Sequence, residues 1–164
     1  MSKAVYAGSF DPPTNGHAWM FTEGTRLFQS LVVAVGTNPD KASTFTAEER
    51  TTMLRQMTGS IDATNIEVAT FHNRYLVDYA QSIGASYILR GIRSPADFEY
   101  ERVMRHMNAD MCPKITTVFL MPPRHIAEVS SSLVKGMVGP KGWQDTVERF
   151  VPEFVFKAIC EKFA

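Results

Sequence analysis

The chain has 164 residues, of which 45% are hydrophobic and 21% are charged, and this suits a single domain, residues 1–164, with a sizeable core. Its 17 lysines and arginines balance 17 aspartates and glutamates, so it lacks the basic excess typical of proteins that bind nucleic acid or an anionic membrane. Local basic residues are still compatible with a small anionic substrate.

The cysteines and the start of the chain indicate the compartment. Cys112 and Cys160 are far apart and form no Cys-x-x-Cys pair, which favours free thiols in a reducing cytoplasm over a structural disulfide. The sequence opens directly on a predicted strand and holds no long apolar segment. We therefore expect neither a signal peptide nor a membrane-spanning helix.

Apolar runs predict five strands, and the segments between them predict helices. The strands are expected at residues 3–7, 31–35, 66–70, 86–89 and 115–121. The helices are expected at about residues 16–28, 46–57, 76–83, 96–111, 130–135 and 152–163, with 136–143 as a loop. The run at 31–35 is apolar throughout, as in a parallel strand buried on both faces. This alternation predicts an α/β fold with a doubly wound, five-stranded parallel sheet of Rossmann-like type.

The turn after the first strand, Gly8 to His17, has the features of a phosphate site. Gly8 lets a ligand approach the backbone closely, and the two prolines that follow stiffen the turn. An Asn-Gly pair then leads into a helix whose free N–H groups and positive dipole end attract anions. Taken alone, such a turn is more often an ordinary strand–turn–helix connection with a surface histidine.

Other segments with anion-binding groups also follow strands. The carboxyl ends of parallel strands meet at one edge, where open α/β sheets bind ligands. The segments expected at this edge are residues 8–17, Lys41, 90–93 and 130–135. None of them is needed to build the core, so the sequence predicts a crevice for nucleotide chemistry.

The segment Gly8–His17 resembles the (T/S)-F-D-P-x-x-x-G-H signature of the nucleotidyltransferase superfamily. Arg90–Glu101, Ser130–Lys135 and Phe45–Arg50 are similar to segments of the bacterial phosphopantetheine adenylyltransferases, and Arg90–Glu101 is the most specific of them. The resemblance covers nearly the whole chain. It implies transfer of the adenylyl group of ATP to 4′-phosphopantetheine, giving dephospho-coenzyme A and pyrophosphate with Mg²⁺ present.

The resemblance also implies how the reaction proceeds. The phosphate of the acceptor would attack the α-phosphorus of ATP in line, so catalysis would rest on positioning and charge stabilisation. The sequence agrees, since it offers no Ser–His–Asp or Cys–His arrangement. Mg²⁺ would arrive with ATP, and we assign no metal site to protein residues.

By resemblance, His17 is the catalytic residue and stabilises charge on the α-phosphate as pyrophosphate leaves. Ser9 would contact the transferring phosphates of both substrates, and Phe10 would donate its backbone N–H to ATP. Without the motif, His17 would be interpreted as an exposed helix histidine, Ser9 as a turn residue that caps a backbone group, and Phe10 as a core ring.

Lys41 and Arg90 match the basic pair that holds the acceptor phosphate, where two cations reduce the repulsion between reacting anions. Lys41 alone would be a solvated loop lysine, and Glu101 alone a helix-surface glutamate. One serine of the three at 130–132 would alternatively be an N-cap. The residues expected to bind ATP are Ser9, Phe10, His17, Gly91, Ile92, Arg93, Glu101, Ile126, Ala127, Glu128, Val129, Ser130, Ser131 and Ser132.

Two segments depart from the family pattern. Leu76 is the nearest match to the apolar residue that meets the pantetheine arm, but residues 71–76 are more polar and one residue longer than usual. Residues 123–129 lack the aromatic residue that often precedes the serines. Both departures bear on the substrates more than on the reaction type.

Two other functions are compatible with parts of the sequence. A related nucleotidyltransferase would use nicotinamide mononucleotide or a phosphorylated alcohol, against which the 90–101 segment argues. A nucleotide-binding sensor or scaffold would lack turnover, against which His17 and Lys41 argue. The resemblance also implies a homo-oligomer, usually a hexamer, which nothing in the sequence indicates independently.

Overall fold

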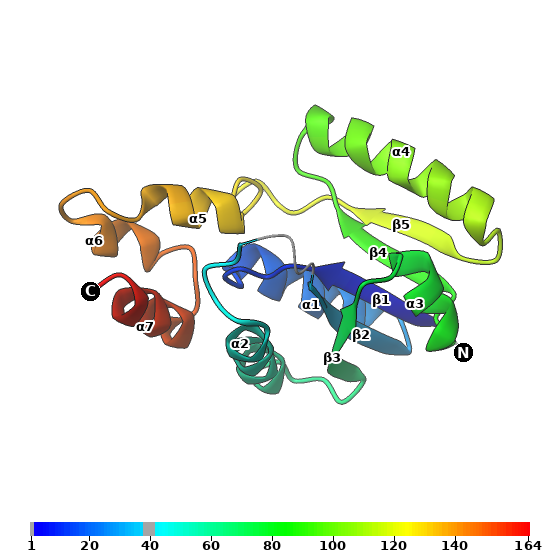
Figure 1. Cartoon of the computed structure of the whole chain (residues 1–164), viewed down its shortest axis with the longest axis horizontal. Coiled ribbons are helices and arrows are strands. Elements are labelled where there is room, and N and C mark those ends of the chain that lie inside the picture. The colour runs from blue at the N-terminus through cyan, green and yellow to red at the C-terminus, as the bar shows by residue number, and fades with distance from the viewer. Residues whose placement is uncertain (1, 38–41) are drawn as a thin grey trace.

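The computed structural model describes residues 2–37 and 42–164 and is built around one sheet (Figure 1). Its strands are β1 Lys3–Gly8, β2 Ser30–Thr37, β3 Ile66–His72, β4 Tyr87–Gly91 and β5 Thr116–Leu120. Their order is β3-β2-β1-β4-β5, and every neighbouring pair is parallel. The chain winds from β1 to one side and then returns to the other, so the switch point lies between β1 and β4. The predicted five-stranded parallel sheet is confirmed.

Helices cover both faces of the sheet. In the described part of the chain they are α1 Asn15–Leu27, α2 Ala47–Gly59, α3 Leu76–Ser82, α4 Pro95–Met111, α5 Ser131–Met137, α6 Trp143–Val147 and α7 Glu153–Lys162. Phe21 of α1 and Leu54 of α2 belong to a buried cluster with Val33. Val77 of α3 belongs to a second cluster with Val32. Successive strand residues point to opposite faces, so these clusters lie on opposite sides of the sheet.

Local sequence signals set several helix starts. The hydroxyl of Thr46 accepts the N–H of Glu49 at 3.2 Å, and the Glu49 carboxylate accepts the N–H of Thr46 at 2.6 Å. This capping box opens α2 at the predicted start of the helix, at about residue 46. Ser94 caps α4, and Pro95 occupies its first position, where a missing N–H costs no helical bond.

The C-terminal part differs from the sequence prediction. The expected loop at 136–143 instead contains the last residues of α5 and the first residue of α6. Gly142 precedes α6 with a φ of +80°, a conformation that favours glycine. Val147 of α6 is fully buried against Val151 and Val155. Packing therefore stabilises this short helix, and its five residues are too few to show a periodic pattern in the sequence.

Four strands end later than predicted: β1 at Gly8, β2 at Thr37, β3 at His72 and β4 at Gly91. Arg90 therefore lies within the sheet and not in the segment that follows it. Register pairs Arg90 with Phe119 of β5. The backbone of Arg90 is thus fixed by a neighbouring strand. None of the helices within the described residues has the length and apolar character needed to cross a bilayer.

Candidate active site

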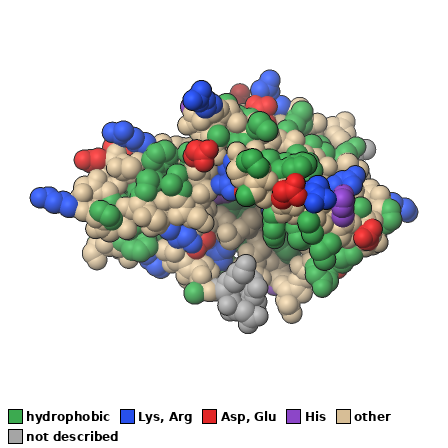
Figure 2. Space-filling model, turned by 90° about the horizontal axis from the view of Figure 1, so that it is seen from above, with side chains coloured by type: hydrophobic (Ala, Val, Ile, Leu, Met, Phe, Trp, Pro, Cys, Tyr) green, Lys and Arg blue, Asp and Glu red, His purple; other side chains and the backbone are tan. Residues whose placement is uncertain are grey.

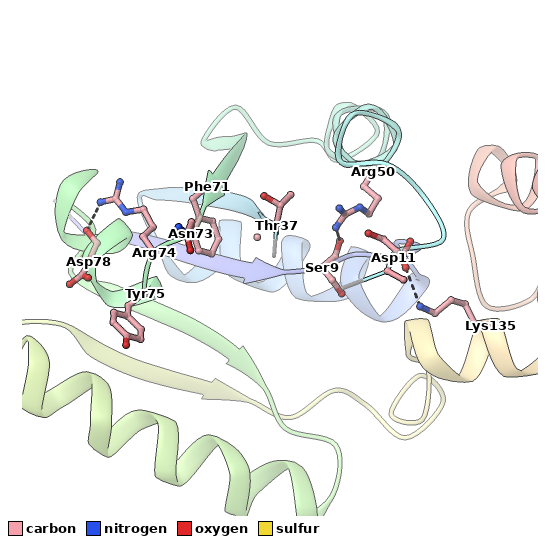
Figure 3. Close-up of a pocket in the computed structure, with 13 residues that line it drawn as sticks. Ser9, Asp11, Thr37, Arg50, Phe71, Asn73, Arg74, Tyr75, Asp78 and Lys135 are labelled. Atoms are coloured by element: carbon pink, nitrogen blue, oxygen red, sulfur yellow. Dashed lines mark hydrogen bonds and ion pairs between the residues drawn. The ribbon is translucent and has the colours of Figure 1, made fainter. Parts of the chain in front are cut away.

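Two cavities open at the carboxyl edge of the sheet. The smaller, of about 340 Å³, lies at the switch point and is lined by the ends of β1 and β4, the start of α1 and the segment before α5. The larger, of about 940 Å³, lies at the ends of β2 and β3 and is drawn in Figure 3. Ser9 lines both cavities.

His17 in the smaller cavity is held in one tautomer by Thr14, the N-cap residue of α1. The N–H of Thr14 donates to Nδ1 of His17 at 3.0 Å, and the Thr14 hydroxyl lies 3.0 Å from the same nitrogen. Burial, and secondly the charge of Arg93, lowers the pKa of His17 from 6.5 to about 4. The ring is therefore neutral at pH 7, with Nδ1 as acceptor and the proton on Nε2. It packs edge-on against Phe10, at 5.0 Å between centroids, and is not a free surface histidine.

Arg90 and Glu101 form a largely buried ion pair in the wall of the smaller cavity. Nε of Arg90 donates to Oε1 of Glu101 at 2.9 Å, Nη2 donates to the same oxygen, and Nη1 donates to the carbonyl of Ala7 at 2.8 Å. Burial would lower the pKa of Arg90, but Glu101 outweighs it and the pKa is raised. Glu101 is 7% exposed, so its alternative interpretation as a surface glutamate is wrong.

Two serines at the start of α5 have different structural roles: one caps the helix and the other joins it to another segment. Oγ of Ser130 accepts the N–H of Leu133 at 3.1 Å, which makes Ser130 the N-cap. The hydroxyl of Ser131 donates to the carbonyl of Pro12 at 2.8 Å. Ser131 therefore ties α5 to the turn after β1.

Gly16 lets α1 approach the segment before α5. A Cβ on Gly16 would lie 2.9 Å from the carbonyl oxygen of Val129, a backbone atom that cannot rotate away. Any larger residue would push the first turn of α1 away from residues 126–132. This close approach brings two segments that are distant in sequence to one cavity.

Most residues predicted to contact the substrates line the smaller cavity. They are Ser9, Phe10, His17, Arg90, Gly91, Arg93, Glu101, Ile126, Val129, Ser130, Ser131 and Ser132. Ile92, Ala127 and Glu128 do not line it, and the Ile92 N–H donates to the carbonyl of Leu120 at 2.9 Å. Arg90 was expected at the acceptor, yet it lies in this cavity and not in the larger one. Lys41 falls outside the described residues.

The larger cavity contains a charged cluster that sequence reasoning missed. The buried Asp11 carboxylate accepts the N–H groups of Thr44 and Phe45 at 2.9 and 2.8 Å and pairs with Lys135 at 3.1 Å. Burial would raise the pKa of Asp11, but these donors outweigh it and the pKa is lowered. Arg50 lies beside it, as Figure 3 shows. Asp11, Arg50 and Lys135 belong to three separate segments that resemble the family, but nothing in the sequence indicated that they meet.

The opposite end of the larger cavity is formed by the unusual loop after β3. Asn73, Arg74 and Tyr75 line it (Figure 3), and Asn73 has a φ of +46°. Arg74 is fastened there, since it donates to the carbonyl of Asp78 at 3.0 Å and lies over the ring of Tyr79. Leu76, the expected contact of the pantetheine arm, begins α3, packs partly buried against a core cluster and does not line the cavity.

Several charged groups around the cavities form ion pairs with one another: Arg90 with Glu101, Arg93 with Asp97, and Lys135 with Asp11. Among residues 2–37 and 42–164, no group of three or more His, Cys, Asp or Glu side chains is arranged to hold a metal ion. Arg93, for example, donates through Nε to Asp97 at 2.9 Å. The arrangement provides cations, hydroxyls and a neutral histidine donor, which suit phosphate groups.

Comparisons with known proteins agree with this chemistry. A family model described as cytidylyltransferase-like matches residues 5–137. A phosphopantetheine adenylyltransferase of Chromobacterium violaceum is 52% identical over 164 residues, which cover 100% of this chain and 99% of that protein. A phosphopantetheine adenylyltransferase of Neisseria meningitidis serogroup B is 55% identical over 157 residues, 96% of this chain and 91% of that protein.

Solved structures share the fold at much lower identity. Nicotinic acid mononucleotide adenylyltransferase of Plasmodium falciparum, complexed with NaAD, has a TM-score of 0.74 at 14% identity and covers 98% of this chain and 95% of its own. A putative nicotinate-nucleotide adenylyltransferase of Vibrio parahaemolyticus has a TM-score of 0.63 at 14% identity, covering 98% and 99%. These likenesses bear on the fold alone. The identity to curated relatives along nearly the whole chain decides the family: this chain belongs to the phosphopantetheine adenylyltransferases, within the nucleotidyltransferases.

Proposed function

We propose that the protein transfers the adenylyl group of ATP to 4′-phosphopantetheine, forming dephospho-coenzyme A and pyrophosphate in the cytoplasm. The observation that carries this proposal is the place of Ser9, which lines both cavities. A nucleotide in the smaller cavity and a phosphorylated acceptor in the larger one would bring their phosphates together at this residue. Membership of the family supports the choice of these two substrates.

The proposed step is a direct displacement. A phosphate oxygen of the acceptor forms a bond to the α-phosphorus, and the bond from that phosphorus to the oxygen bridging to the β-phosphate breaks. Pyrophosphate leaves with the electron pair. No covalent enzyme intermediate is needed, so the protein contributes alignment and stabilisation of charge.

In the smaller cavity, we assign the α-phosphate to His17. Its Nδ1 is occupied by Thr14, so the Nε2 proton is the one left to donate. A neutral donor needs no proton exchange with solvent before each turnover. The hydroxyl of Ser132 and the backbone N–H of Ser131 would meet the outer phosphates of ATP, since the Ser131 hydroxyl donates to Pro12. Arg93 would supply positive charge at the cavity wall.

In the larger cavity, we assign the acceptor phosphate to the end near Ser9 and Lys135. The pantetheine arm would then extend toward Phe71 and the loop after β3. Lys41, outside the described residues, remains proposed as a phosphate ligand by family resemblance. Arg90 would act across the boundary between the cavities, since it lines the nucleotide side.

Mg²⁺ is proposed to accompany ATP. The carboxylates that line the smaller cavity, Asp97 and Glu101, are paired with Arg93 and Arg90. They offer no free ligand set, which fits an ion held mainly by phosphate oxygens and water. The ion would neutralise charge on the leaving pyrophosphate.

The experiment that tests this function measures pyrophosphate release from ATP or CTP with a panel of acceptors. We expect turnover with ATP and 4′-phosphopantetheine, and none with nicotinamide mononucleotide or phosphorylated alcohols. His17→Ala should keep ATP affinity, measured by calorimetry, and lose most turnover. Preference for another acceptor would refute the assigned substrate. Binding of ATP without turnover on any acceptor would identify a sensor or scaffold.

We also propose that the protein forms a homo-oligomer, a hexamer by family resemblance. α4 supports self-association, because Glu101 is the one buried residue among its 17. Tyr100, Val103, Met107 and Met111 recur at helical spacing and are 46–62% exposed. Figure 2, which views the molecule from above, shows hydrophobic side chains exposed on the right half, where α4 lies in Figure 1, as well as on the left half. A second copy of the same chain would cover such a stripe.

A further inference from the structure

Arg50 on α2 is a buried charge that no role assigned above uses. It is 4% exposed, and burying a guanidinium is costly unless its donors are satisfied. Nη1 donates to the carbonyl of Ser9 at 2.6 Å, and Nε donates to the carbonyl of Thr46 at 3.3 Å. Figure 3 shows its guanidinium directed from α2 toward Ser9. The strongest contact of this arginine is therefore with the backbone at the junction of the two cavities.

The residue after Ser9 has a strained backbone. Phe10 has a φ of +49°, a region that bulky side chains rarely adopt. Its ring is 1% exposed and packs against Tyr6 and Phe21, with centroids 5.7 and 6.0 Å away. Such a conformation persists only where the surroundings hold it. Here the core holds the ring and Arg50 holds the preceding carbonyl.

The geometry of a peptide group then directs the Phe10 N–H. Among the described residues only Asp11–Pro12 is cis, so the Ser9–Phe10 peptide is trans and its C=O and N–H point in opposite directions. With the carbonyl turned to Arg50, the N–H is turned away from α2, and Phe10 lines the smaller cavity. Within residues 2–37 and 42–164 this N–H donates to no protein acceptor. A fixed, unpartnered backbone donor beside a phosphate cavity is arranged like the donor of an oxyanion hole.

We propose that Arg50 is a positioning residue for adenylyl transfer, which fixes the Ser9 carbonyl and thereby aims the Phe10 N–H at the α-phosphate. This inference rests on the proposed function. The guanidinium suits the task because its fork of donors spans the carbonyls of Ser9 and Thr46 at once. A lysine ammonium at this position would hold one carbonyl and leave the other.

The test compares kcat and both KM values of the wild type with those of Arg50→Lys, Arg50→Ala and a control, Arg55→Ala. Arg55 lies on the same helix and is exposed. We expect Arg50→Ala to lower kcat by about 100-fold, the loss that follows removal of one fixed donor from an oxyanion site, with both KM values unchanged. Arg50→Lys should lie between wild type and Arg50→Ala. Added guanidinium ion should restore part of the lost kcat in Arg50→Ala and leave Arg55→Ala unaffected.

The outcomes separate this inference from the proposed function. A wild type that fails to adenylylate 4′-phosphopantetheine would overturn the function itself. With an active wild type, an unchanged kcat in Arg50→Ala would overturn the positioning role. So would a raised acceptor KM at constant kcat, since Arg50 would then bind the acceptor directly. Should Arg50→Ala not fold, as judged by circular dichroism, the same comparison of kcat and KM in Arg50→Lys decides.

Discussion

Glu101→Gln tests the ion pair in the wall of the smaller cavity. The substitution keeps the shape of the side chain but leaves the Arg90 guanidinium partly buried without its countercharge. Removing one partner of a buried pair costs about 3–5 kcal/mol. Because the Arg90 side chain keeps 27% exposure, solvent screens part of this cost and we expect the low end, about 3 kcal/mol. For a chain of this length, that lowers Tm by about 6–12 °C.

The assay is urea unfolding followed by circular dichroism at pH 7, at one protein concentration for all variants. Glu99→Gln is the matched control on the same helix, since Glu99 pairs with Arg102 but its side chain is 63% exposed. An exposed pair contributes about 0–1 kcal/mol, so the control should stay close to the wild type. A Glu101→Gln protein as stable as the control would refute the reasoning that this pair is buried and coupled.

Three further outcomes are expected. His17 has its pKa lowered to about 4 in the folded protein, so the unfolded state binds more protons between pH 6.5 and 4 and stability falls as pH drops through this range. The wild type should lose about 2 kcal/mol of unfolding free energy between pH 7 and 5, measured by urea unfolding, and His17→Asn should lack this loss. The same dependence of unfolding free energy on pH in both proteins would contradict the prediction. Asp11→Asn should destabilise the protein by about 2–3 kcal/mol, because a buried, charged acceptor of two N–H groups is lost. Lys135→Met should destabilise it less. If thermal unfolding ranks the two variants in the reverse order, Asp11 is not the centre of the cluster. Met107→Glu should dissociate the proposed oligomer in light scattering, and an unchanged mass would remove α4 from the interface.

Much of the fold could be predicted because its signals are local. The apolar run from Leu31 to Val35 marks a buried strand wherever it occurs, and β2 contains it. The capping box at Thr46 and the Ser-Pro pair before α4 act within one helical turn. The turn from Gly8 to His17 likewise carries its phosphate-binding chemistry in consecutive residues.

The charged partners could not be predicted in the same way. Glu101 looks like a surface residue of α4 until β4 places Arg90 beneath it. Asp11 and Lys135, 124 positions apart, meet only because α5 returns to the turn after β1. Arg50 reaches Ser9 across 41 positions, and no periodicity relates them.

Sequence alone thus determined the strands, most helices and the phosphate-binding turn, since propensity, capping and alternation act between residues a few positions apart. Tertiary structure decided which charges are buried and which partners they meet. It also decided that Arg90 lines the smaller cavity and that Leu76 does not line the larger one. Burial and electrostatic pairing depend on distances in space, and for segments this far apart the order of strands in the sheet sets those distances.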